Sequence, residues 1–165
     1  MTVVTVRRTL PFPPQQVFDF VADMANDPHW APMVSDVTQI EGDGPGEGAR
    51  WAFQQAIGKR SKELESTMTV YDRPSRLAWS IEHRLLDYQA TMAFEPVQGG
   101  AATRVVQTNR ESWKAMPKWL QLLAPLLVRY QLKKQLRLLE KALAEGGPKT
   151  IEEKEGKREA QAPSA

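Results

Sequence analysis

Residues 7–23 read RRTLPFPPQQVFDFVAD, and residues 26–32 read NDPHWAP. The first segment joins a β-like run to a proline-rich corner and then to a short helix with one apolar side. The second segment combines Asn, Asp and Pro in a turn that ends on Trp30. We therefore expect a first strand, then a short helix and a turn, and then the remaining strands of a sheet.

The middle of the chain alternates apolar and polar residues, which is the pattern of half-buried strands. The alternating runs are 51–57, 64–70, 77–81, 86–94 and 103–110. Short turns rich in Gly, Pro and Asp separate them, so we expect an antiparallel sheet with one face toward a core and the other toward water. In this arrangement Glu63, Glu65 and Glu82 face solvent and are not expected to serve as catalytic carboxylates.

The last apolar region changes the side on which its large residues fall. One stripe consists of Met116, Trp119, Leu120, Leu123, Leu127 and Tyr130, and the other of Val128, Leu132, Leu136, Leu139 and Leu143. At about 100° per residue the two stripes lie on different sides of a helix. Pro117 and Pro125 each suit the first turn of a helix better than its interior. We therefore expect a short helix over 117–123, a break near Pro125, and a long helix over 125–145 that faces the sheet with the second stripe.

Three further segments carry a resemblance to a known family: GEG at 46–48, DRPSRLAW at 72–79 and GGAATRV at 99–105. With the opening segment, they make residues 3–145 resemble the START-like helix-grip superfamily of polyketide cyclases/dehydrases and lipid-transport proteins. The resemblance implies an α+β fold in which a curved antiparallel sheet of six to seven strands wraps around a long C-terminal helix and an apolar cavity, with two short helices after the first strand. These markers specify the scaffold rather than the ligand, because one scaffold can carry many functions.

In a helix-grip fold the core and the cavity wall are the same surface, so large inward residues are candidate ligand contacts. We predict a mainly apolar cavity of roughly 300–1,000 Å³ between sheet and helix. Its predicted ligand-binding residues are Trp30, Trp51, Phe53, Met68, Trp79, Tyr88, Met92, Gln107, Asn109, Leu123 and Leu127. The polar members and Ser66 could orient a ligand, or could equally satisfy one another or bound water.

The favoured function is a binding or carrier protein for a small hydrophobic ligand, such as a lipid, quinone, polyketide or aromatic, because no residue set has the specificity of a catalytic motif. The alternative is a cyclase or dehydratase-type enzyme in which Tyr88, Asn109 or His29 polarises a carbonyl. Asp27 and Asp23 could pair with His29 for acid–base work. Ordinary turn chemistry is the favoured explanation of these three residues.

The apolar segment 119–130 admits several roles. It could form a lid over the cavity mouth, or a surface that binds a partner protein or a second copy of the chain, which leaves both a monomer and a homodimer open. The row Arg129, Lys133, Arg137 and Lys141 is typical of the solvated face of an amphipathic helix. Joined to the apolar segment, the same row could instead dock on an anionic membrane as a peripheral contact.

Composition bounds the remaining possibilities. The length of 165 residues and the 41% hydrophobic fraction suit one globular domain, expected over residues 1–145. Residues 146–165 are charged and have little to bury, so we expect a disordered tail. The absence of cysteine excludes a disulfide and a thiol nucleophile, and two histidines are too few for a three-His metal site. We therefore predict neither a metal nor a cofactor.

Charge and hydropathy add expectations about partners and location. A net charge of +2 gives no reason to expect binding of nucleic acid. No apolar run approaches the roughly 20 residues of a membrane-spanning helix. The first residues alternate like a strand and lack the pattern of a signal peptide. A cytoplasmic location is the resulting expectation.

Overall fold

Seven strands form one antiparallel sheet in the order β1-β7-β6-β5-β4-β3-β2. The structure is a computed structural model that describes residues 1–146. Its strands are β1 (Thr2–Leu10), β2 (Val34–Glu41), β3 (Arg50–Ile57), β4 (Arg60–Asp72), β5 (Arg76–His83), β6 (Leu86–Val97) and β7 (Ala102–Trp113). Its helices are α1 (Pro14–Ala22), α2 (Asp27–Trp30) and α3 (Lys118–Ala144), with 3-10 turns η1 (Met24–Asn26) and η2 (Gln98–Gly100).

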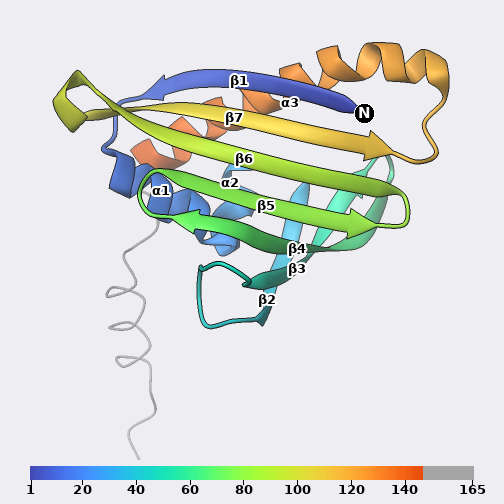
Figure 1. Ribbon diagram of the computed structural model, residues 1–165, viewed down its shortest axis with the longest axis horizontal. Coiled ribbons are helices and arrows are strands. Elements are labelled where there is room, and N and C mark those ends of the chain that lie inside the picture. The colour runs from blue at the N-terminus through green and yellow to red at the C-terminus, as the bar shows by residue number, and fades with distance from the viewer. Residues whose placement is uncertain (147–165) are drawn as a thin grey trace, which may run out of the picture.

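The helices lie together on one face of the sheet, which is the predicted α+β helix-grip arrangement (Figure 1). Helix α1 begins at the proline pair 13–14, where a proline costs no hydrogen bond, and buries Val17, Phe18 and Val21. Helix α2 follows after one 3-10 turn and packs against α3. The two short helices expected after the first strand are therefore present, and they cover one end of the sheet.

The second half of α3 completes the core. Leu132, Leu136, Leu139 and Leu143 recur at intervals of four, three and four residues, which keeps them on one side of the helix. All four are buried, as the second apolar stripe predicts. Inward residues of the sheet lie in the same core cluster. They include Leu77, Met92, Phe94 and Val105.

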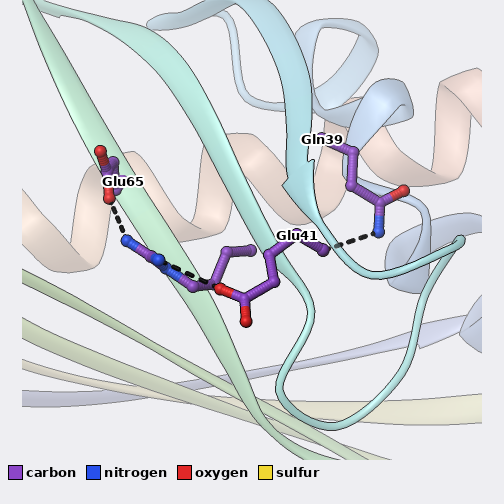
Figure 2. A network of polar contacts seen from close by, with 4 residues as sticks. Gln39, Glu41 and Glu65 are labelled. Atoms are coloured by element: carbon purple, nitrogen blue, oxygen red, sulfur yellow. Dashed lines mark hydrogen bonds and ion pairs between the residues drawn. The ribbon is translucent and has the colours of Figure 1, made fainter.

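The outer face of the sheet is charged and solvated, and Glu63, Glu65 and Glu82 are all exposed there as predicted. Figure 2 shows how polar side chains link β2, β3 and β4 on this side. Arg50 contacts Glu41 at 3.1 Å and also pairs with Glu65, while Gln39 Nε2 donates to the backbone carbonyl of Glu41 at 3.2 Å. These exposed pairs contribute little stability individually, so the network is a surface feature rather than a site.

The predicted break near Pro125 is wrong, because α3 runs without interruption from Lys118 to Ala144. A proline inside a helix leaves the carbonyl four residues earlier without its partner. Here that residue is Gln121, which lies in an exposed turn near the start of the helix, where water can bond to the carbonyl. The helix therefore tolerates Pro125, and no separate helix over 117–123 exists.

The predicted lid is also wrong. Trp119, Leu123, Leu127 and Tyr130 are exposed on the outside of α3 and are absent from the lining of the interior cavity. Once the helix is continuous, the side that carries these residues points away from the sheet. Within residues 1–146, no helix combines the length and the apolar character needed to cross a membrane.

Candidate functional site

A cavity of about 240 Å³ lies between the sheet and α3. Its walls come from α2, from strands β2 to β7 and from the inner side of α3, which contributes Val128, Gln131, Leu132 and Gln135. The cavity is smaller than the predicted range of roughly 300–1,000 Å³. The reason is that several large residues expected in its wall fill the neighbouring core instead.

The predicted site residues fall into three groups. Those that line the cavity are Trp30, Phe53, Trp79, Tyr88, Gln107 and Asn109. Trp51, Met68 and Met92 are buried in the core and do not reach the cavity. Leu123 and Leu127 lie outside the lining on the exposed side of α3. The structure thus brings six of the predicted residues together around one space.

A ladder of polar side chains runs along the sheet wall of the cavity. Alternation in β7 turns Gln107 and Asn109 inward together, because they are two residues apart. Gln107 Nε2 donates to Asn109 Oδ1 at 3.2 Å, and Asn109 Nδ2 donates to the Tyr88 hydroxyl at 2.8 Å. Burial, followed by the charges of Glu111 and Asp27, raises the pKa of Tyr88 far above its ordinary value. The phenol therefore remains neutral and keeps its proton as a hydrogen-bond donor.

Strand register places more polar groups at the level of Tyr88. Ser66 lies opposite Ile81, Ile81 opposite Tyr88, and Tyr88 opposite Glu111, so one inward row crosses β4, β5, β6 and β7. Glu111 also lines the cavity, and burial raises the pKa of its carboxyl group. Trp113 Nε1 donates to Glu111 Oε2 at 3.1 Å. The Glu111 carboxyl group is therefore an acidic part of the cavity wall that the sequence analysis did not identify.

Asp27 lines the cavity, although the sequence analysis considered it only as a partner of His29 and did not place it among the ligand-binding residues. It occupies the first position of α2 and lines the cavity, and its Oδ1 atom is buried without a hydrogen-bond partner. Burial, and then the nearby charge of Asp23, raise the pKa of Asp27 well above its ordinary value. The Asn-Asp-Pro sequence around it is typical of a turn. A turn sequence gives no indication that the Asp27 side chain lies in the wall of a cavity.

The structure does not bring Asp23, Asp27 and His29 together around one cavity, in line with the favoured explanation of turn chemistry. His29 is exposed and lines a separate surface groove beside Leu138 and Lys141 of α3. Asp23 accepts a hydrogen bond from the Ala25 backbone and caps the 3-10 turn. Asp27 alone among the three lines the cavity. Turn geometry thus accounts for Asp23, while His29 and Asp27 serve different surfaces.

Unpartnered polar atoms concentrate at the cavity. Among residues 1–146, four buried side-chain atoms have no hydrogen-bond partner: Asp27 Oδ1, Trp30 Nε1, Ser66 Oγ and Gln107 Oε1. All four residues line this one cavity. Buried polar atoms are nearly always paired, since leaving one unpaired costs about 1–3 kcal/mol. Their grouping around one cavity marks it as a place where bound water or the polar part of a bound molecule can satisfy them.

Chemically, this arrangement suits the binding and polarisation of a small organic molecule more than metal chemistry. Over the described part of the chain, no three His, Asp or Glu residues gather in a way that could hold a metal ion. The cavity instead offers amide, hydroxyl, indole and carboxyl groups set in a largely apolar wall. A few such groups fix the orientation of a ligand whose remaining surface is apolar.

Comparison with solved structures shows the same fold in proteins of low sequence identity. TTHA0849 from Thermus thermophilus is 20% identical, with a TM-score of 0.70 over 88% of this chain and 99% of its own. Norcoclaurine synthase from Thalictrum flavum, in complex with dopamine and hydroxybenzaldehyde, is 14% identical, with a TM-score of 0.64 over 90% of this chain and 89% of its own.

A third solved structure is the di-domain ARO/CYC protein BexL of the BE-7585A biosynthetic pathway. It is 18% identical, with a TM-score of 0.67 over 87% of this chain and 48% of BexL. No curated protein sequence matches the chain. Residues 1–144 match the family described as polyketide cyclase / dehydrase and lipid transport. Because this match covers most of the 165 residues, the chain belongs to the polyketide cyclase/dehydrase and lipid-transport family.

Proposed function

We propose that this chain binds a small, mainly apolar molecule bearing hydroxyl or carbonyl oxygens, and holds it between the sheet and α3 as a binding or carrier protein. The observation that carries the proposal is the gathering of four unpartnered buried polar atoms around one cavity. A cavity of about 240 Å³ favours a compact ligand, such as one small aromatic ring system, over a long lipid chain.

The unpartnered atoms indicate which groups the ligand should offer. Gln107 Oε1 can only accept a hydrogen bond, so it needs an O–H or N–H donor. Trp30 Nε1 can only donate and has the Asp27 carboxyl group beside it as an acceptor, while Ser66 Oγ can donate or accept. A molecule with both a hydroxyl and a carbonyl group meets the requirements of Gln107 and Ser66. Phe53, Trp79 and the other apolar wall residues would contact its ring.

A ligand-displacement assay tests the proposal. The wild-type protein should enhance the fluorescence of anilinonaphthalene sulfonate, and a hydroxybenzaldehyde should displace the dye. Gln107→Leu should weaken displacement by about tenfold or more, which is the effect of losing one buried hydrogen bond to a ligand. Gln89→Leu is the matched control, since Gln89 lies on the exposed face of β6. Native mass spectrometry of protein purified from cells would then identify a co-purified molecule.

One observation favours an enzymatic alternative. A carboxyl group whose pKa is raised keeps its proton to a higher pH than an ordinary one, and Asp27 carries such a carboxyl group at the cavity wall within the electrostatic reach of Tyr88. A cyclase or dehydratase-type enzyme would use such an acid to protonate a carbonyl or a leaving hydroxyl. Asp27→Asn separates the two functions: a carrier keeps its ligand affinity within a few-fold, whereas an acid-catalysed conversion of a bound hydroxy-carbonyl compound is lost.

A further inference from the structure

The first three turns of α3 carry an unusual surface outside the cavity. Nine large hydrophobic residues are exposed within the described part of the chain, and six of them belong to this one segment. We name these six the apolar face: Trp119, Leu122, Leu123, Leu126, Leu127 and Tyr130. Leu122 is 82% exposed and Leu126 is 69% exposed. A contiguous apolar patch of this kind on a monomer marks a surface that contacts another body.

The apolar face points away from the rest of the protein. At about 100° per residue, Trp119, Leu126 and Tyr130 lie within a narrow arc of the helix. The buried residues Ala124 and Leu132 lie on the opposite side. In Figure 1 the first turns of α3 extend beyond β1 at the upper right, while its later turns pass behind the sheet. No described element covers the apolar face.

The charge of the same region has one sign. Residues 112–139 contain six of the 22 lysines and arginines and none of the 20 acidic residues. Lys114 pairs with Asp87. The other five cations are exposed and make no ion pair with any residue of 1–146. They are Lys118, Arg129, Lys133, Lys134 and Arg137.

The cations continue the apolar face along the helix. Lys133, Lys134 and Arg137 fall on the same outward side as Trp119 and Tyr130, one to two turns later. The outward side of α3 is therefore apolar over its first three turns and basic over the next two. A flat surface placed along this side would contact the apolar turns and the basic turns at the same time.

This charge pattern distinguishes between two candidate occupants. A two-fold dimer would place the same patch of both subunits face to face. Centred on the apolar face, such a dimer would leave the basic turns of the two subunits at its opposite ends, and no acidic residue of the segment could pair with them there. An anionic surface has the complementary charge. An amphipathic helix with Trp and Leu on one part and Lys and Arg beside it lies in the plane of a lipid interface.

We propose that the outward side of α3 docks on an anionic phospholipid bilayer, with the apolar face inserted at the acyl boundary and Lys133, Lys134 and Arg137 against the headgroups. The inner side of the same helix lines the cavity with Val128, Gln131 and Leu132. Docking through α3 therefore holds the cavity one helix diameter from the membrane. A ligand that partitions into lipid would have a short path to the cavity.

Vesicle flotation of the full chain tests the proposal. Protein should float with vesicles of equal parts phosphatidylcholine and phosphatidylglycerol, and not with phosphatidylcholine alone, and raised salt should release it. Trp119→Ser/Leu126→Ser should weaken binding by about a hundredfold through loss of inserted apolar surface. Lys133→Gln/Lys134→Gln/Arg137→Gln should weaken it by a similar factor, because each basic side chain contributes roughly fivefold near an anionic surface.

The control variant changes the same amount of charge elsewhere. Arg7→Gln/Arg76→Gln/Arg110→Gln alters three exposed cations on the outer face of the sheet and should bind as wild type does. Sedimentation of lipid-free protein supplies the second measurement. Three outcomes would overturn the proposal: no flotation with anionic vesicles, equal flotation with both compositions, or a stable dimer that Trp119→Ser/Leu126→Ser dissociates.

Discussion

The interior beneath the second half of α3 differs from the interior beneath its first half. Leu136, Leu139 and Leu143 pack against sheet residues that are almost completely buried, and no unpartnered buried polar atom among the described residues belongs to this end. Beneath Val128 and Gln131, the same sheet presents polar and aromatic side chains around a cavity. The same sheet and helix thus form a filled end beneath Leu136, Leu139 and Leu143 and a hollow end beneath Val128 and Gln131. The side chains that lie between sheet and helix determine whether an end is filled or hollow.

The largest expected effect tests the filled end. Leu139→Ala should lower the free energy of unfolding by about 2–5 kcal/mol, because it leaves a void among buried neighbours that cannot collapse. Val128→Ala at the hollow end should cost about 1 kcal/mol, since Val128 is half-buried and already borders empty space. Urea denaturation measures both. Equal losses at the two positions would show that the ends are packed alike.

The second effect concerns the polar ladder of the hollow end. Asn109→Leu removes the amide that bonds both Gln107 and Tyr88, and it leaves two buried groups without their partner. We expect a loss of about 1–3 kcal/mol in the free energy of unfolding, together with weaker dye displacement by a hydroxybenzaldehyde. Gln89→Leu, on the exposed face, should change neither quantity. A variant of Asn109 as stable as wild type would mean that the ladder does not hold the wall.

A smaller, pH-dependent effect follows from the raised pKa of Asp27. The folded state holds this proton more tightly than the unfolded state, so stability is greatest at low pH and falls as the pH rises from the ordinary carboxyl range toward the raised pKa. Asp27→Asn has no proton to lose. Its melting temperature relative to wild type should therefore increase as the pH rises above the ordinary carboxyl range of about 4.

Asp43→Asn is the control for that measurement, because Asp43 lies in an exposed loop. Its melting temperature should follow wild type across the same range. A constant difference between Asp27→Asn and wild type would indicate that the Asp27 carboxyl group titrates alike in the folded and unfolded states, and that the hollow end holds no protonated acid.

The smallest effect concerns the outward side of α3. Lys133→Ala and Arg137→Ala should each change the free energy of unfolding by no more than about 0.5 kcal/mol, because both side chains are exposed and unpaired among the described residues. Denaturant melts beside Leu136→Ala would show the contrast between neighbouring positions of one helix. If Lys133→Ala lowered the free energy of unfolding as much as Leu136→Ala, the assignment of the outward and inner sides of α3 would be wrong.

The fold could be predicted from the sequence because its signals are local. Alternation fixes which strand residues face inward, so Phe53, Tyr88, Gln107 and Asn109 were identified correctly as inward. Alternation does not say whether an inward residue meets a partner across the gap. Met68 and Met92 share the inward pattern but fill the core, because the helices cover their part of the sheet.

The remaining errors have the same non-local origin. Asp27 carries a turn signature in the sequence, and nothing local in that signature places its carboxyl group, with a buried Oδ1 atom, in the cavity wall. Glu111 continues the inward series of β7, and that parity could have revealed it. At Pro125, the rule that prolines end helices failed because the orphaned carbonyl lies in an exposed turn. The predicted tail over 146–165 lies almost entirely outside the described residues.

The strand order also has a kinetic consequence. The first strand, β1, finds its partner only in β7, so that Thr5 lies opposite Thr108. During synthesis at about 5–20 residues per second, β1 waits several seconds or more before its neighbour leaves the ribosome. Until then its backbone edge and the apolar residues Val4 and Val6 have no native contact across the sheet. Contacts this distant in sequence slow folding, and the nascent chain is most open to chaperones or to mispairing in that interval.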